Sequence, residues 1–177
     1  NKDYFSKMCG IFGLAVTNQF NKRYPRKIID ITNNLFLFSQ TRGSEAAGLA
    51  INNELEINVL KQASSPKNFI KEDGYKKLFS KTLNLPNNES KKDAFNQHFS
   101  LIGHSRLVTN GDQSEGVNNQ PVISKGIVGV HNGIITNEEE LLNQNKFITK
   151  ESSLDSEILF KLFRNNFIKE KDIFKSI

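Results

Sequence analysis

Two short apolar runs, residues 99–102 and 127–130, constrain the fold most, because each is too short for an ordinary helix and leads into a polar cluster. The first run leads into the His-Ser-Arg sequence at 104–106, and the second leads into the His-Asn-Gly sequence at 131–133. Runs of this length and composition are typical of buried strands. The sequence therefore predicts a sheet-containing fold in which two strands present polar side chains where they end.

The rest of the chain alternates predicted helices and strands over 177 residues, a length that suits one domain. Residues 26–39 are predicted to be a helix, because Ile28, Ile31, Leu35 and Phe38 recur at helical spacing. The other expected elements are strands at 11–16, 49–51 and 56–61, helices at 66–83 and 153–167, and loops at 84–97 and 107–120.

Composition argues against a membrane protein and against a nucleic-acid-binding protein. The net charge is +5, but the only tight basic cluster lies at 22–27 and coincides with an expected helix start. No apolar run reaches 18 residues, and residues 1–8 lack the apolar core of a signal peptide. The single cysteine excludes an intrachain disulfide and zinc sites built from cysteine pairs, which fits a cytoplasmic protein.

That cysteine, Cys9, has a structural and a catalytic interpretation. A lone cysteine is most often a small buried hydrophobic residue. However, Cys9 follows Met8, the only methionine, and residues 1–8 are interpreted as a pro-segment, as upstream residues or as residues added for expression. Removal of Met8 would give Cys9 a free amine with a pKa of about 7.7–8.0, which can accept the thiol proton without a catalytic histidine. We therefore expect the mature protein to begin at Cys9.

Three polar groups later in the chain also allow two interpretations each. An Asn-Gly pair is a strong hairpin signal, but the side-chain amide of Asn132 and the backbone N–H of Gly133 could also hold an oxyanion. Arg106 would ordinarily be a surface cation, but its planar guanidinium could hold an α-carboxylate. Asp155 would ordinarily cap a helix, but it could receive an α-ammonium group. Arg106 and Asp155 together would recognise a free amino acid.

The order of these groups resembles that of the class II, or N-terminal-nucleophile, glutamine amidotransferases. The resemblance spans residues 9 to about 160 and begins with the Cys-Gly-Ile-Phe-Gly sequence at Cys9. Its other blocks run from Thr41 to Gly48, Gly103 to Gly111, Asn118 to Pro121, Val130 to Ile135 and Leu154 to Glu157. The last two blocks are most similar to the glutaminase domain of the glutamine–fructose-6-phosphate aminotransferase branch.

The resemblance implies a fold and a catalytic group. The fold is α+β, a four-layer αββα N-terminal-nucleophile hydrolase sandwich with two antiparallel sheets between helix layers, over residues 9–177. Cys9 is implied to be the nucleophile and its amine the base. Asn132 and Gly133 are implied to form the oxyanion hole. No metal and no organic cofactor are implied.

The resemblance also implies a substrate and its binding residues. Arg106 would bind the carboxylate of L-glutamine, Asp155 would bind its ammonium group, and Thr109 would lie in the binding loop. Arg42 would support the region around the nucleophile. The implied reaction is hydrolysis of L-glutamine to L-glutamate and ammonia through a cysteinyl thioester.

The ammonia would pass to a C-terminal synthase or isomerase domain or subunit that aminates a sugar phosphate, converting fructose 6-phosphate to glucosamine 6-phosphate. The chain stops at Ile177 inside an apolar-periodic segment, so we expect a fragment of such a synthase, with a homodimer as one assembly. Leu107 and Asn110 depart from the Trp and His that this branch usually has. The alternatives are the glutaminase domain of an asparagine synthetase-like or other amidotransferase, an N-terminal-cysteine hydrolase of another amide, and a non-catalytic glutamine-binding domain.

Overall fold

The computed structural model of the chain describes residues 9–83, 98–107 and 118–176. The segment 1–8, the expected loop at 84–97 and the predicted binding residue Thr109 lie outside the described residues.

A four-stranded antiparallel sheet in the order β1-β4-β2-β3 forms the centre of the molecule. Its strands are β1 (Gly10–Val16), β2 (Ala46–Asn52), β3 (Ile57–Gln62) and β4 (Phe99–Arg106). The four strands predicted for this part of the chain are confirmed, but the polar cluster at 104–106 lies within β4 and not after it. Strand β4 continues because it pairs on both sides, with Gly10 opposite Ser105 and Ala46 opposite Arg106.

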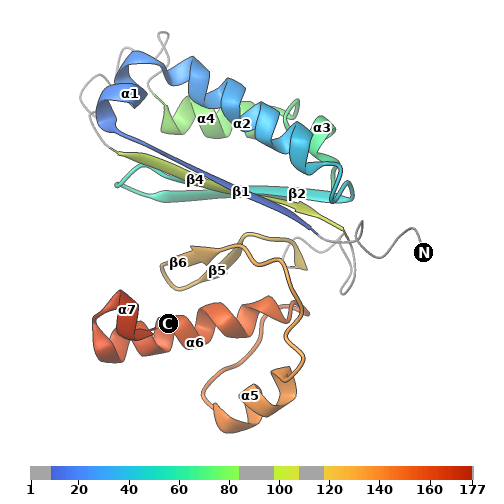
Figure 1. Cartoon of the computed structure of the whole chain (residues 1–177), viewed down its shortest axis with the longest axis vertical. Coiled ribbons are helices and arrows are strands. Elements are labelled where there is room, and N and C mark those ends of the chain that lie inside the picture. Colours follow the sequence, from blue (N-terminus) through green and yellow to red (C-terminus); the bar gives the residue numbers. More distant parts are fainter. Residues whose placement is uncertain (1–8, 84–97, 108–117, 177) are drawn as a thin grey trace.

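Four helices cover one face of this sheet (Figure 1). They are α1 (Asn18–Arg23), α2 (Pro25–Ser39), α3 (Pro66–Phe69) and α4 (Asp73–Thr82). Aromatic rings fill the space between helices and sheet, where Phe36, Phe69, Tyr75 and Phe79 are buried and meet at tilted or edge-to-face angles. The single helix predicted at 66–83 is two helices, because Glu72 has an extended backbone (φ −62°, ψ 145°) that interrupts the helix.

A second, two-stranded antiparallel sheet lies against the other face of the first sheet (Figure 1). It comprises β5 (Val122–Ser124) and β6 (Ile127–Gly129), and it is followed by α5 (Glu138–Gln144), α6 (Ser156–Glu170) and α7 (Ile173–Ser176). Helix α6 packs on β5 and β6, so the layers succeed one another as helices, sheet, sheet and helices. The predicted α+β fold with two antiparallel sheets between helices is therefore confirmed.

The chain that enters the second sheet lies directly against Gly48 of β2. A Cβ atom at this position would lie 1.9 Å from the carbonyl oxygen of Gln120 and 2.8 Å from Cδ of Pro121. Only a glycine fits there, so the chain entering β5 passes directly over β2. This contact places residues 118–121 on the inner face of the large sheet, the face that carries Arg106. None of the described helices is both long and apolar enough to cross a membrane.

Candidate active site

Cys9 lies immediately before β1, next to the end of β4. Its thiol donates a weak hydrogen bond to the carbonyl oxygen of Leu107, with 3.7 Å between the sulfur and the oxygen. Its own carbonyl oxygen accepts a hydrogen bond from Nε of Arg42 at 3.4 Å. Burial raises the pKa of the Cys9 thiol, and the hydrogen bond to Leu107 and the charge of Arg106 lower it by less. A thiol in this setting needs a base to become a nucleophile.

A buried serine pair lies next to the strand that carries the nucleophile. The hydroxyl oxygens of Ser39, at the end of α2, and Ser105, on β4, are 2.5 Å apart. Ser105 pairs in the sheet with Gly10, the residue that follows Cys9. The pair thus ties α2 to the sheet beside the start of β1. Sequence reasoning missed it, because 66 positions separate the two serines.

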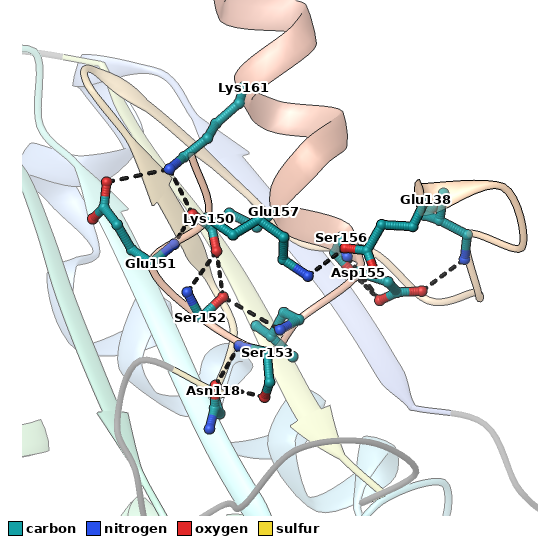
Figure 2. Close-up of polar contacts among 12 residues, drawn as sticks. Asn118, Glu138, Lys150, Glu151, Ser152, Ser153, Asp155, Ser156, Glu157 and Lys161 are labelled. Atoms are coloured by element: carbon teal, nitrogen blue, oxygen red, sulfur yellow. Dashed lines mark hydrogen bonds and ion pairs between the residues drawn. The ribbon is translucent and has the colours of Figure 1, made fainter. Parts of the chain in front are cut away.

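Arg106 is buried on the inner face of the sheet, and it is not the surface cation that its residue type would suggest. One of its guanidinium nitrogens, Nη1, donates to the carbonyl oxygen of Asn118 and to Oδ1 of Asn119, the latter at 2.8 Å. Oδ1 of Asn118 in turn accepts hydrogen bonds from the backbone N–H and the hydroxyl of Ser153, at 2.9 and 2.8 Å. Asn118 therefore links Arg106 to the segment that leads to Asp155. Figure 2 shows the contacts of Asn118 with Ser153.

Asp155 caps the N-terminus of α6, the structural role expected of an aspartate there. Oδ1 accepts hydrogen bonds from the backbone N–H of Ser156 at 2.7 Å and from its hydroxyl at 3.2 Å. Oδ2 accepts a hydrogen bond from the backbone N–H of Ile135 at 2.6 Å. The carboxylate thus holds together the start of α6 and the turn that contains Asn132 and Gly133.

Asn132 and Gly133 do not form a hairpin turn. They follow β6 in a stretch without strand pairing, and the next regular element is helix α5. Gln120 fixes the preceding residue, His131, through both of its backbone groups: Oε1 accepts from the His131 N–H at 2.6 Å, and Nε2 donates to the His131 carbonyl at 2.8 Å. The hairpin interpretation is therefore wrong, because this segment leaves the sheet and crosses toward α6.

His104 is a buried base that sequence reasoning did not single out as a site residue. It is 1% exposed, and its Nε2 has no hydrogen-bond partner in the described part of the chain. Burial, together with the charges of Arg106 and His131, lowers the pKa of His104 to about 4. The imidazole is therefore neutral at pH 7.

A polar network holds the segment that precedes α6 (Figure 2). Glu157 is 3% exposed and accepts hydrogen bonds from the backbone N–H groups of Glu151 and Ser152, both at 2.8 Å, and from the Ser152 hydroxyl at 2.6 Å. It also forms an ion pair with Lys161 at 2.6 Å. Burial alone would raise the pKa of Glu157, but the hydrogen bonds from Lys161 and Ser152 lower it below its usual value. Glu157 thus stays ionised and fixes the approach to Asp155.

The predicted site residues therefore form two groups. Cys9 lies with Arg42 and Arg106 at the start of β1, and Asn132 and Gly133 lie with Asp155 at the start of α6. Asn118 bonds Arg106 of the first group and Ser153, which lies close to Asp155 of the second. His104 interacts electrostatically with both Arg106 and His131. Among the described residues, no cluster of three or more His, Cys, Asp or Glu side chains could hold a metal ion. A separate cavity of about 620 Å³ lies between β3, β5 and α6, and no predicted site residue lines it.

Comparison with known proteins gives several similar sequences, although no protein-family model matches the chain. The chain is 34% identical over 168 residues to the isomerizing glutamine–fructose-6-phosphate aminotransferase 2 of Bos taurus. The matched region covers 89% of this chain and 23% of the bovine protein. The human form is 33% identical with the same coverage, and the Saccharomyces cerevisiae enzyme is 33% identical over 162 residues, 88% of this chain and 21% of its own length. The chain thus spans about a quarter of the length of the curated relatives that it matches.

Proposed function

This chain is related over nearly its whole length to glutamine–fructose-6-phosphate aminotransferases, and we propose that residues 9–177 are a glutamine amidotransferase domain that hydrolyses L-glutamine. The observation that carries the proposal is the position of Cys9. The only thiol of the chain lies at the start of the central sheet, beside Arg42 and Arg106. Because burial raises the pKa of this thiol, catalysis needs a base close to it. The amine that Cys9 acquires when Met8 is removed would supply that base, as in N-terminal-nucleophile hydrolases.

The reaction would proceed through a thioester. The Cys9 amine takes the thiol proton, and the thiolate attacks the γ-carboxamide carbon of glutamine. The carbonyl oxygen becomes an oxyanion, which the Asn132 amide and the Gly133 N–H stabilise; one such donor is worth about 2.7–4 kcal/mol. The C–N bond then breaks, and the nitrogen leaves as ammonia with the proton that the amine held. Water hydrolyses the γ-glutamyl thioester to glutamate and restores the thiol.

Substrate recognition would come from the two charged residues that Asn118 links. Arg106 would bind the α-carboxylate of glutamine through its guanidinium, and its burial would strengthen that attraction. Within the described part of the chain, Oδ2 of Asp155 accepts a hydrogen bond from the Ile135 N–H, and it can accept a further one, which the α-ammonium group of glutamine would donate. Thr109 would complete the binding loop, and Arg42 would hold the backbone of the nucleophile through the Cys9 carbonyl.

The ammonia would serve a second reaction elsewhere in the same protein or assembly. The names of these relatives describe transfer from glutamine to fructose 6-phosphate with isomerisation, and this chain spans only about a quarter of their length. We therefore place the amination of a sugar phosphate outside residues 9–177. Generating ammonia next to its acceptor favours its reaction there over its loss to solvent.

The test compares the chain that begins at Cys9 with the same chain retaining residues 1–8. The first form has a free amine on the nucleophile and should release glutamate from glutamine. The second form has an amide nitrogen at that position and should release none, although its fold is the same by circular dichroism. Cys9→Ala in the first form is the matched control and should also be inactive. Equal activity in the two forms would overturn the proposed base, and activity in the Cys9→Ala variant would overturn the whole assignment.

A further inference from the structure

The turn formed by residues 131–135, which we call the oxyanion turn, is anchored at both ends and free of regular structure between them. At its start, Gln120 bonds both backbone groups of His131. At its end, Oδ2 of Asp155 accepts the N–H of Ile135 at 2.6 Å. A third anchor joins the imidazole of His131 to the hydroxyl of Ser156, with 3.0 Å between Nδ1 and Oγ.

Ser156 is hydrogen-bonded on two sides. Its hydroxyl donates to Oδ1 of Asp155 at 3.2 Å, and its oxygen lies 3.0 Å from Nδ1 of His131. Ser156 is 2% exposed, so water does not compete for these bonds. The result is a continuous chain of hydrogen-bonded groups from His131 through Ser156 to Asp155.

The imidazole that this chain fixes lies directly against Gly133. A Cβ atom at Gly133 would be 2.7 Å from Nε2 of His131 and 3.0 Å from Cε1. The Nε2–Cε1 edge of the ring therefore lies against the backbone of Gly133. A ring that leaves this position removes the support of the turn, and a displacement of about 1 Å in a catalytic group can reduce a rate by about 100-fold.

We propose that Ser156 is a positioning residue for glutamine hydrolysis: it holds the His131 ring, and the ring holds the Asn132–Gly133 turn in the geometry that an oxyanion hole requires. The inference rests on the proposed function, because it takes these two residues to be the oxyanion donors. Ser156 itself touches no substrate. Asp155 is unsuitable for the test, because its removal would affect both the turn and the proposed ammonium site.

The test is Ser156→Ala in the chain that begins at Cys9, with two kinetic readouts. Its kcat should fall about 10- to 100-fold while the KM for glutamine changes less than about twofold, because the oxyanion exists only in the transition state. The affinity for glutamate γ-semialdehyde, an aldehyde that the thiol converts to a tetrahedral adduct, should fall in proportion to kcat. A residue that only stabilised the fold would lower the amount of active protein and leave the affinity of the remainder unchanged.

Two further variants sharpen the result. His131→Phe keeps a ring of similar size but removes Nδ1, so it should match Ser156→Ala, and the double variant should be no worse than either alone. Thr82→Ala also removes a buried hydroxyl, but this one donates to the Leu78 carbonyl within α4, in the helix layer on the opposite face of the large sheet. It should leave kcat and the aldehyde affinity unchanged.

The outcomes separate the two claims. An unmodified chain that begins at Cys9 and releases no glutamate would overturn the proposed function, and this inference with it. An active unmodified chain whose Ser156→Ala variant keeps its kcat would overturn the inference alone. So would a variant that raises KM and leaves the aldehyde affinity unchanged, because that result would place Ser156 in ground-state binding.

Discussion

Folding keeps His104 uncharged, so the stability of the chain should depend on pH over a range set by this one side chain. The imidazole is 1% exposed, its Nε2 has no partner in the described part of the chain, and the charges of Arg106 and His131 oppose its protonation. Its pKa is therefore lowered from an ordinary 6.5 to about 4. The perturbation that reveals this effect is the replacement His104→Gln, which removes the titrating group and keeps a polar side chain.

The sign and the size of the effect follow from proton linkage. Between pH 6.5 and about 4 the unfolded chain binds a proton at His104 and the folded chain does not, so the free energy of unfolding falls as pH falls. Each tenfold change in proton affinity is worth about 1.4 kcal/mol, so the lowered pKa of His104 corresponds to a loss of about 3 kcal/mol across this range. Above pH 6.5, His104 contributes no pH dependence.

Urea unfolding at a series of pH values from 7.5 to 4 measures this directly. The unfolding free energy of the unmodified chain should fall by about 3 kcal/mol more than that of His104→Gln between those limits. Carboxylates that titrate in the same range contribute to both proteins, so the difference between the two curves isolates His104. Parallel curves for the unmodified chain and His104→Gln would show that folding does not lower the proton affinity of His104.

Two other changes test the packing and the link between the charged residues. Gly48→Ala should destabilise the chain by about 1–3 kcal/mol, because its Cβ would lie 1.9 Å from a backbone carbonyl oxygen. Gly13→Ala is the control: its Cβ would have its nearest contact at 3.5 Å, so it should cost less than about 1 kcal/mol. The midpoints of urea unfolding measure both effects. Asn118→Ala removes the hydrogen bonds to Ser153 and loosens the support of Arg106. The KM for glutamine should therefore rise about tenfold with a smaller change in kcat. An unchanged KM would contradict a role of Asn118 in positioning Arg106.

The sequence predicted the strands of the large sheet but not which residues of the helices are buried. Ile31 and Phe38, whose spacing predicted helix α2, are 36% and 76% exposed. Its buried face instead carries Thr32 and Ser39, with Ile28 and Phe36. The two hydroxyls can be buried because they donate to backbone carbonyls within the helix, Thr32 to Ile28 at 2.7 Å and Ser39 to Phe36 at 3.0 Å. Apolar periodicity assigns no buried position to such residues.

In the site, too, the sequence indicated individual residues but not the distant residues that they contact. Arg106, Asn132 and Gly133 were visible in the sequence, because each lies in a polar cluster that follows a short apolar run. Their partners were not, since Gln120 meets His131 across 11 positions and Asn118 meets Ser153 across 35. No local pattern predicts such pairs. Strand β5 also escaped prediction, because its three residues gain their stability from packing against α6 and not from their own composition.

The central claim is that Cys9 forms a covalent bond with the glutamine side chain, and trapping the intermediate tests it most directly. The chain that begins at Cys9 would be mixed with glutamine, quenched with acid within the first turnovers, and digested for mass spectrometry. We predict a γ-glutamyl thioester on the peptide that contains Cys9, which forms before free glutamate accumulates and is removed by hydroxylamine. Release of glutamate with no adduct on Cys9, at quench times shorter than one turnover, would contradict the account.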